Sequence, residues 1–517
     1  MVKTGRKRLY DHLNRPILSD REKLLLQIRN QASFVAGDHA RRSMRGWLTS
    51  DGDPNTDLNG ELATIRERSR DLYRNTPLAA GALDRAAENV VGSGLRLQSR
   101  IKRKLLNIED DAADQWERET EARFDQWASS KDADLARTLN FYEMTEVAFL
   151  SALMSGDCFA VMPLVPRPRS DCDLRISLYE GDYVSNPQMQ PNSKNLTQGI
   201  EINPSTGAPV RYWFQKSHPG AEMPSFEWTP IPAFGSKSGR RNVIHLFKPK
   251  RPSQRRGYPI LTPVVETLKQ LSRYSESELM AAVVSSFFTV FIKQESKGDG
   301  AGLGAGYTDD QSILTGSDSD NKLIEMGNGT IIDLGENESI ETADPKRPND
   351  SFKPFYNAVV EQVGAATGIP FEVLIQHFSS SYSASRAALI EFWKFVTNRR
   401  AWLARNWCDL IYEEFLTDQI IKGKIKAPGF MDDNFIRFAW LGSAWQSNIG
   451  RGMIDPLKEI KAAKEKINAR LGTYEDEYAT MNGGDWESGM DRLGREEKFL
   501  NERNIQPVKT TAGGGIQ

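Results

Sequence analysis

The sequence predicts an α+β fold, and three observations support this prediction. Two stretches, 261–294 and 383–420, carry apolar residues at helical spacing and predict long helices. Between residues 174 and 250, short β-rich runs alternate with turn clusters such as Asn203–Gly207 (NPSTG), which predicts a small antiparallel sheet. Helices and strands that occupy separate stretches of a chain are typical of this fold class.

The N-terminal region differs in composition from the rest. Lys and Arg outnumber Asp and Glu by 11 to 4 over residues 1–50, and Asp51-Gly-Asp-Pro-Asn55 interrupts regular structure, so we expect a flexible basic arm with one helical patch. Thr76 is expected to cap a helix that begins at Pro77, with Gly92 and Gly94 ending it. The sequence next predicts helices at about 109–128 and 141–154, and strands at 158–164, 174–178, 199–202, 210–214 and 243–247.

An acidic, glycine-rich insert separates the two long helices. Residues 294–344 hold nine Gly and twelve Asp and Glu against two Lys, a net charge of about −10 by count. Short strands are expected at 322–326 and 330–334. Beyond the second long helix we predict a strand at 434–439, helices that begin after Asp455, Thr473 and Asp485, and a disordered tail at 509–517.

Composition excludes several classes of protein. The 517 residues include 67 Lys and Arg against 69 Asp and Glu, a net charge of −2, which argues against tight general binding to DNA. Cys158, Cys172 and Cys408 show no metal-ligand spacing and are expected to be free, buried thiols. No apolar run reaches the ~20 residues that span a bilayer. The basic start is not followed by the apolar region of a signal peptide, so a soluble cytoplasmic protein without a membrane partner is expected.

The sequence gives no positive indication of catalysis, of a cofactor or of a metal site. The glycine run 298–306 lacks the Lys-Ser/Thr of a phosphate-binding loop and follows a helix, so a linker is the preferred interpretation. The five histidines are scattered, and His245 within Val-Ile-His-Leu-Phe is interpreted as structural. Carboxylate ligands can lie far apart in a chain, so a metal-dependent DNA-processing nuclease of a mobile element stays an alternative, as does a capsid or scaffold subunit.

Six blocks of sequence resemble the lambda-type family of phage portal proteins, and they occur in the order of that family. Together they extend over roughly residues 65–505. The blocks are Arg74–Leu95 (RNTPLAAGAL to NVVGSGL), Ser155–Phe159 (SGDCF), Val243–Gly257 (VIHLFKPKRPSQRRG), Gly368–Glu372 (GIPFE), Ser381–Arg386 (SYSASR) and Asp455–Glu459 (DPLKE).

The resemblance implies a portal-type ring subunit with an α/β wing, long stem helices, a small α/β clip and a helical C-terminal crown. On that plan the regions are a flexible basic arm (1–60), the wing (61–260), a first stem helix (261–294), the clip-like insert (295–345), a second stem helix (346–368), a channel or tunnel loop (369–382), a long channel-side helix (383–420), a return to the wing (421–472), and crown helices with a disordered tail (473–517).

The resemblance also implies function, partners and sites. It implies a homododecamer at one capsid vertex of the virion, assembled in the host cytoplasm, through which double-stranded DNA passes during packaging and ejection. Its partners would be the terminase large subunit, the major capsid or scaffold protein and the head–tail connector. The family pattern of serines and a tyrosine is filled by Ser379, Ser380, Ser381, Tyr382 and Ser383, which either contact DNA or simply cap a helix. Docking of terminase or connector is expected at Asp309, Asp310, Asp318, Asp320, Glu336 and Glu338.

Overall fold

The computed structural model describes residues 51–286, 290–294, 338–342, 351–378, 381–447, 450 and 455–503. The chain divides into two units, residues 1–59 and 60–517. Of the first unit, helix α2 (Pro54–Leu58) is described, and Asp53 caps it by accepting a hydrogen bond from Asn55 N. The remainder of the expected arm lies outside the described residues. Within the described part of the chain, no helix is both long and apolar enough to cross a membrane.

The first half of the second unit is built on helices that the sequence predicts closely. Helix α4 (Pro77–Val90) begins at the expected proline, and α7 (Phe141–Met154) has the expected bounds. Thr76 occupies the N-cap position of α4, but its side chain makes no capping hydrogen bond, so that part of the prediction is wrong. Asn140 and Glu143 form a capping box at the start of α7, which satisfies two backbone N–H groups there. The other helices here are α3 (Leu62–Asn75), α5 (Arg103–Leu106) and α6 (Asp110–Ser129), with short 3₁₀ turns η2 (Lys131–Ala133), η3 (Gly181–Tyr183), η4 (Pro187–Met189) and η5 (Thr262–Val264).

Antiparallel sheets confirm the predicted β-rich region. One sheet has the order β3-β2-β8 and a second has the order β4-β5-β6-β7. Their strands are β2 (Asp157–Val161), β3 (Ser177–Glu180), β4 (Leu196–Thr197), β5 (Ile200–Ile202), β6 (Pro209–Gln215), β7 (Trp228–Pro232) and β8 (Val243–Phe247). The expected strand at 174–178 starts later, because Leu174 forms only an isolated bridge with Leu164. A further pair joins distant parts of the chain, β1 (Leu95–Ser99) with β11 (Ser443–Ser447).

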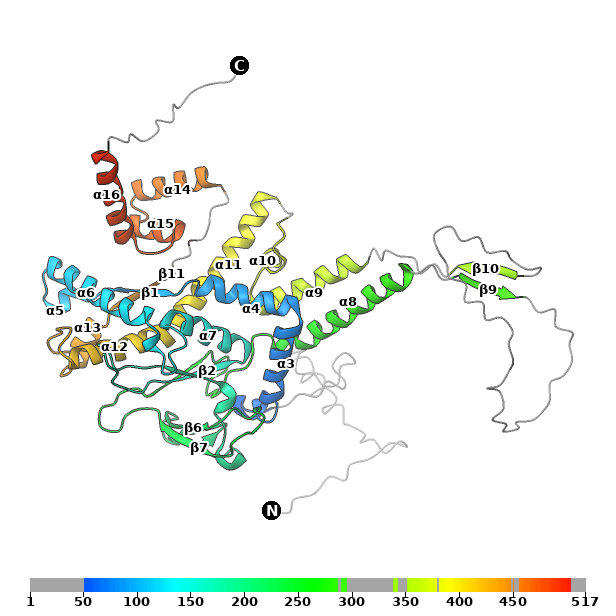
Figure 1. Cartoon of the computed structure of the whole chain (residues 1–517), viewed down its shortest axis with the longest axis horizontal. Coiled ribbons are helices and arrows are strands. Elements are labelled where there is room, and N and C mark those ends of the chain that lie inside the picture. The colour runs from blue at the N-terminus through cyan, green and yellow to red at the C-terminus, as the bar shows by residue number, and fades with distance from the viewer. Residues whose placement is uncertain are drawn as a thin grey trace, which may run out of the picture. The chain divides into compact units, whose positions relative to one another are not determined.

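The first long helix is shorter than predicted. Helix α8 (Val265–Ser286) does not continue to residue 294, because Val290–Gln294 forms strand β9, which pairs antiparallel with β10 (Glu338–Thr342). Val290, Phe291 and Ile292 are residue types that favour strands, and β10 supplies the backbone partners. The strands expected at 322–326 and 330–334 lie outside the described residues. Helix α9 (Phe352–Thr367) packs beside α8 through Tyr274 (Figure 1).

The second long helix is present but is interrupted. It consists of α11 (Tyr382–Leu403), a π turn η6 (Ala404–Cys408) and α12 (Asp409–Ile421). The indole of Trp407, in the π turn, is fully buried and donates to Thr145 Oγ1 of α7 at 3.0 Å. The π turn therefore directs this large side chain into the core.

The prediction of a strand at 434–439 is wrong. Residues Asn434–Trp440 form helix α13, capped by Asp433, which accepts a hydrogen bond from Phe435 N at 2.7 Å. The Trp440 indole donates to Pro428 O at 3.2 Å and packs on Trp116, which fixes the helical turn. The predicted C-terminal helices are present as α14 (Pro456–Asn468), α15 (Tyr474–Met481) and α16 (Trp486–Glu502), with Asp455, Thr473 and Asp485 as caps.

An aromatic cluster joins helices from both ends of the second unit. Phe124 of α6 lies 5.5 Å from Phe141, 5.1 Å from Phe415 and 5.6 Å from Trp445, measured between ring centroids.

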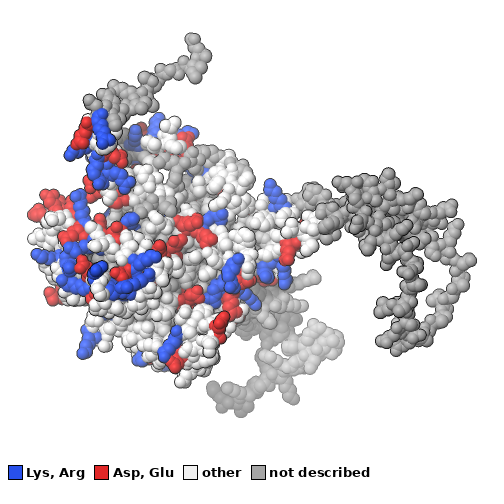
Figure 2. Space-filling view, viewed as in Figure 1, with Lys and Arg blue, Asp and Glu red and all other residues white. Residues whose placement is uncertain are grey.

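Charged side chains of both signs are interspersed on the face shown in Figure 2, in line with the small net charge of the chain. The three cysteines are free and buried, as predicted.

Candidate functional site

The junction between α9 and α11 contains the loop that the sequence assigns to the channel. Gly368, with φ of +79°, ends α9, and its N–H donates to Gly364 O at 2.8 Å. A short helix, α10 (Phe371–Ile375), follows and ends at Gln376, which also has positive φ. The two left-handed residues turn the chain twice within a few positions, so that it re-enters a helix at Tyr382.

Two backbone contacts hold α11 against the helix that carries the first family-like block. Arg400 donates from Nε to Val90 O at 3.0 Å and from Nη2 to Asn89 O at 2.9 Å. These carbonyls lie at the C-terminal end of α4, where a helix has acceptors without partners and a partial negative charge. The block Asn89-Val-Val-Gly therefore has a structural explanation, since it offers the carbonyls that position α11.

The serines assigned to the channel are divided by this geometry. Ser381 is the cap of α11 and accepts a hydrogen bond from Ala384 N at 3.4 Å, as the capping interpretation requires. Ser383 is exposed in the first turn of the helix. Tyr382 is the first helical residue, while Ser379 and Ser380 lie outside the described residues. Capping therefore accounts for Ser381 and leaves Ser383 as a surface residue.

The acidic residues assigned to docking are almost all outside the described part of the chain. Asp309, Asp310, Asp318, Asp320 and Glu336 belong to this group. Glu338 is the first residue of β10 and pairs in register with Gln294 of β9. The strand pair places the two ends of the acidic insert next to one another.

A buried ion cluster, which sequence analysis missed, joins two other family-like blocks. The Asp157 carboxylate, at the start of β2, is fully buried. It accepts hydrogen bonds from Arg66 Nη2 at 2.6 Å and Arg256 Nε at 2.7 Å, and His245 Nε2 lies 3.3 Å away. Arg66 also donates to Ser155 O at 2.8 Å. Two short motifs, Ser155-Gly-Asp157 and Arg255-Arg-Gly257, thus meet with helix α3 at one carboxylate.

The glycines in these motifs allow the close approach. Gly156 has φ of +93°, and a side chain there would collide with the backbone of Tyr258. A side chain at Gly257 would collide with the carbonyl of Gly156. Arg256 reaches three carbonyl oxygens beyond the carboxylate, those of Gly181, Val184 and Gln198. The signal available in the sequence was the pairing of an acidic and a basic residue, each beside a glycine, in blocks about a hundred residues apart.

The electrostatics of this cluster indicate a structural role. Burial alone would raise the pKa of Asp157, but the guanidinium groups of Arg256 and Arg66 outweigh it and hold the pKa well below its usual range. Burial lowers the pKa of His245 to about 4, so the imidazole, stacked 4.1 Å from Phe159, is neutral at physiological pH. The carboxylate is inaccessible and fully bonded, so it cannot act as a base on a substrate.

One group of described residues has the composition of a metal site. Glu180, Asp182 and His218 have ligand atoms within 4.8 Å of one another. Arg70 already binds both carboxylates, with its Nη1 at 2.7 Å from Asp182 and 3.4 Å from Glu180. Asp182 also faces Arg66 at 3.9 Å. Two guanidinium groups thus balance the negative charge that would otherwise attract a cation.

The chain is similar in sequence to portal proteins of known phages. The chain is 25% identical to portal protein B of Escherichia phage lambda over 478 residues, which cover 90% of this chain and 89% of the relative. It is 26% identical to the portal protein of Escherichia phage N15 over 486 residues, with the same shares covered. The structural match to a chain from the neck of a native gene transfer agent particle includes 81% of this chain and 93% of that chain, with 9% sequence identity and a TM-score of 0.42.

The family follows from a match over most of the sequence. The profile described as "Phage portal protein, lambda family" matches residues 40–400. The chain belongs to the lambda family of phage portal proteins. It is therefore a structural protein of the virion and a subunit of an oligomeric ring, which confirms the family, the fold class and the general function that the sequence predicts.

Proposed function

We propose that this chain forms a dodecameric ring at one capsid vertex, whose central channel carries double-stranded DNA during packaging and ejection. The match of the portal family to residues 40–400 is the observation that carries the proposal, because it includes the Asp157 cluster, α8, α9 and nearly all of α11. The protein itself has no catalytic role in this proposal. Hydrolysis of ATP belongs to the packaging motor.

Exposed apolar side chains on the paired helices support assembly into a ring. On α8, Leu279 is 67% exposed and Met280 is 61% exposed, and on α9 Phe355 is 50% exposed. Large apolar patches on soluble proteins mark surfaces that other protein covers. We assign α8 and α9 to the stem, residues 61–260 to the wing and 421–472 to its return, the insert 295–345 to the clip and 473–517 to the crown.

The proposed channel contact is the segment Ser379–Ser383. Uncharged hydroxyl groups allow DNA to slide, since each Lys or Arg that meets a phosphate adds a salt-dependent contact that slows movement. Ser383, exposed beside the cap of α11, is the described residue that best fits this role.

The proposed docking surface for terminase and the connector is the acidic insert. Its charge would steer basic partner surfaces, with an effect that weakens as salt rises. The strand pair β9–β10 brings Gln294 and Glu338, which flank residues 295–337, next to each other. The wing is the proposed contact for the major capsid or scaffold protein, and assembly is proposed to take place in the host cytoplasm.

Light scattering and negative-stain microscopy test the ring directly. The purified protein is expected to form particles many times heavier than 58.1 kDa, with a central hole about as wide as a duplex. A stable monomer at micromolar concentration would contradict the proposal. In a parallel assay with plasmid DNA and Mg²⁺ or Mn²⁺, no strand breaks are expected, and metal-dependent cleavage would favour the nuclease alternative.

A further inference from the structure

Helix α16 has an apolar stripe that the described part of its own chain leaves exposed. Met490, Leu493 and Leu500 recur at helical spacing and are 38%, 46% and 37% exposed, and no residue of α16 is buried. Glu497 lies on the same stripe, between Leu493 and Leu500. A stripe of this kind predicts a helical partner, and the carboxylate within it calls for a cation on that partner.

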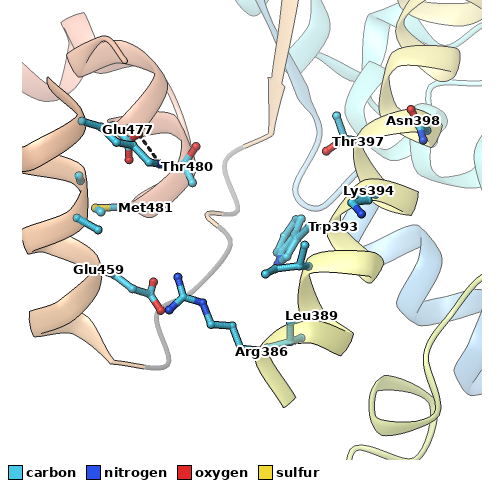
Figure 3. A pocket seen from close by; sticks show the side chains of 14 residues that line it. Arg386, Leu389, Trp393, Lys394, Thr397, Asn398, Glu459, Glu477, Thr480 and Met481 are labelled. Carbon is cyan, nitrogen blue, oxygen red and sulfur yellow. Dashed lines mark hydrogen bonds and ion pairs between the residues drawn. The ribbon is translucent and has the colours of Figure 1, made fainter. Parts of the chain in front are cut away.

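A groove on the same chain has the complementary character. It lies between α11 and the pair α14–α15 and has a volume of about 700 Å³. Its α11 wall presents Arg386, Leu389, Ile390 and Trp393, and Ala463 and Met481 line the other side. Figure 3 shows Trp393 pointing into the groove and Arg386 reaching across it toward Glu459. The groove is thus apolar at its centre, with Arg386 and Glu459 facing each other at one end.

The α16 of the same chain does not fill this groove. None of the residues that line it belongs to α16. Contacts on another side hold α16 in place, because Arg118 of α6 pairs with Glu487 at 3.0 Å and Gln98 of β1 donates to Asp485 at 2.9 Å. Trp486 also stacks on Tyr474 of α15. A copy of α16 that docks in this groove would therefore come from another subunit.

The spacing of side chains on the two helices matches in antiparallel orientation. On α11, Arg386, Ile390 and Trp393 are separated by four and then three residues. On α16, read in reverse, Glu497, Leu493 and Met490 are separated by the same steps. Such steps keep side chains on one face of a helix, so the three pairs can meet in one contact. The charges narrow the contact to one cation. α16 carries five acidic and three basic residues. In the groove, Lys466 already pairs with Glu477 at 3.1 Å and Lys394 with Glu391 at 2.5 Å, so Arg386, which faces Glu459, is the cation best placed to meet Glu497 as well.

We propose that α16 of one subunit docks antiparallel in the α11–α14 groove of the adjacent subunit, with Glu497 against Arg386, Leu493 against Ile390 and Met490 against Trp393. This inference rests on the proposed ring. A closed ring of more than two copies needs two different surfaces that complement each other, and the stripe and the groove are such a pair. The contact would link each crown helix to the channel-side helix of its neighbour.

Disulfide trapping tests the register. In a Leu493→Cys, Ile390→Cys double variant, rings are first verified by negative stain and then oxidised with diamide. A ladder of covalent dimers and higher oligomers is expected on a non-reducing denaturing gel. The matched control is Phe499→Cys with Ile390→Cys, because Phe499 is similarly exposed, at 48%, but lies on the opposite side of α16. The control is expected to yield at least tenfold less ladder.

The outcomes separate this inference from the ring itself. Rings that give no ladder, or equal ladders in both variants, would overturn the docking and leave the ring intact. The disulfide could instead form within one chain, so that the protein runs as a monomer and mass spectrometry finds the linked peptides in the monomer band. That result would show that the groove receives the α16 of its own chain and would also overturn the proposed docking. Failure of the wild-type protein to form rings would instead refute the proposed function.

A charge-reversal pair adds a second test. Arg386→Glu should weaken rings at low salt, and the double variant Arg386→Glu, Glu497→Arg should restore them.

Discussion

The carboxylate of Asp157 accepts a hydrogen bond from Nε of Arg256, 99 residues later in the chain, at 2.7 Å, and both side chains are buried. Because Arg66 and His245 meet the same carboxylate, four segments depend on one ionised group. A buried ion pair is not in itself strongly stabilising, but the loss of one partner leaves uncompensated charge.

Removal of the charge on Asp157 should therefore destabilise the fold. For Asp157→Asn we expect a loss of about 3–5 kcal/mol in the free energy of unfolding, measured by urea denaturation. Glu119→Gln is the matched control, because it breaks an exposed pair with Arg123 and should cost less than about 1 kcal/mol. Equal losses in the two variants would show that Asp157 does not organise the cluster.

His245 should make stability depend on pH in the acidic range. Burial lowers its pKa from 6.5 to about 4, so the folded protein binds this proton less readily than the unfolded chain does. The contribution of the neutral His245 to the free energy of unfolding is complete above pH 6.5 and is lost as the pH falls toward 4. The total loss is about 3 kcal/mol. Thermal unfolding followed between pH 7 and 4 should show a shallower decline for His245→Gln than for the wild type. Parallel curves would contradict the assignment.

Glu121 should lower the stability of the fold as the pH rises, whereas His245 lowers it as the pH falls. Burial, with the nearby carboxylates of Asp485 and Glu117, raises its pKa to about 7, against the hydrogen bond from Ser99 N at 2.6 Å. The folded state favours the protonated form, so stability falls between pH 4.5 and 7 as the unfolded chain ionises first. Glu121→Gln keeps an acceptor for Ser99 and should be about 1–3 kcal/mol more stable than wild type at pH 8. The two proteins should converge near pH 4, and a destabilised variant at pH 8 would refute this.

The two roles of the serine segment can be separated by substitution. Ser383→Lys should leave rings intact and slow DNA packaging, because each subunit adds a phosphate contact, while Ser383→Gln should package normally. Ser381→Ala should cost about 1 kcal/mol of local stability through loss of the cap, and Ser381→Asp should retain it. Packaging rates that do not respond to Ser383→Lys would remove this residue from the channel.

The acidic insert should affect partner binding without affecting assembly. Replacement of its six proposed docking residues by the corresponding amides should leave rings intact and weaken terminase binding at low ionic strength. The sites are Asp309, Asp310, Asp318, Asp320, Glu336 and Glu338. The difference from wild type should fade as salt rises, because screening removes the charge advantage of the native insert. Unchanged binding at every salt concentration would exclude this surface as the docking site.

Local signals were sufficient where the chain specifies its own helix ends. Pro77 after Thr76, the Asn140–Glu143 box and the caps Asp455, Thr473 and Asp485 act within a few residues, so the sequence by itself determined those helices. The α+β class and the family also followed from the order of elements and motifs. These features depend on neighbours along the chain.

Contacts between distant segments decided the rest. The stretch Asn434–Trp440 has a short apolar pattern that fits a strand as well as a helix, and the packing of Trp440 on Trp116 selects the helix. Helix α8 ends before Val290 because β10, more than forty residues later, pairs with that segment. The Asp157 cluster forms only when folding brings Arg66, which precedes Asp157 in the chain, together with Arg256, which follows it. Periodicity and capping carry no information about such partners, since the energy of a buried pair exists only once the chain has folded around it.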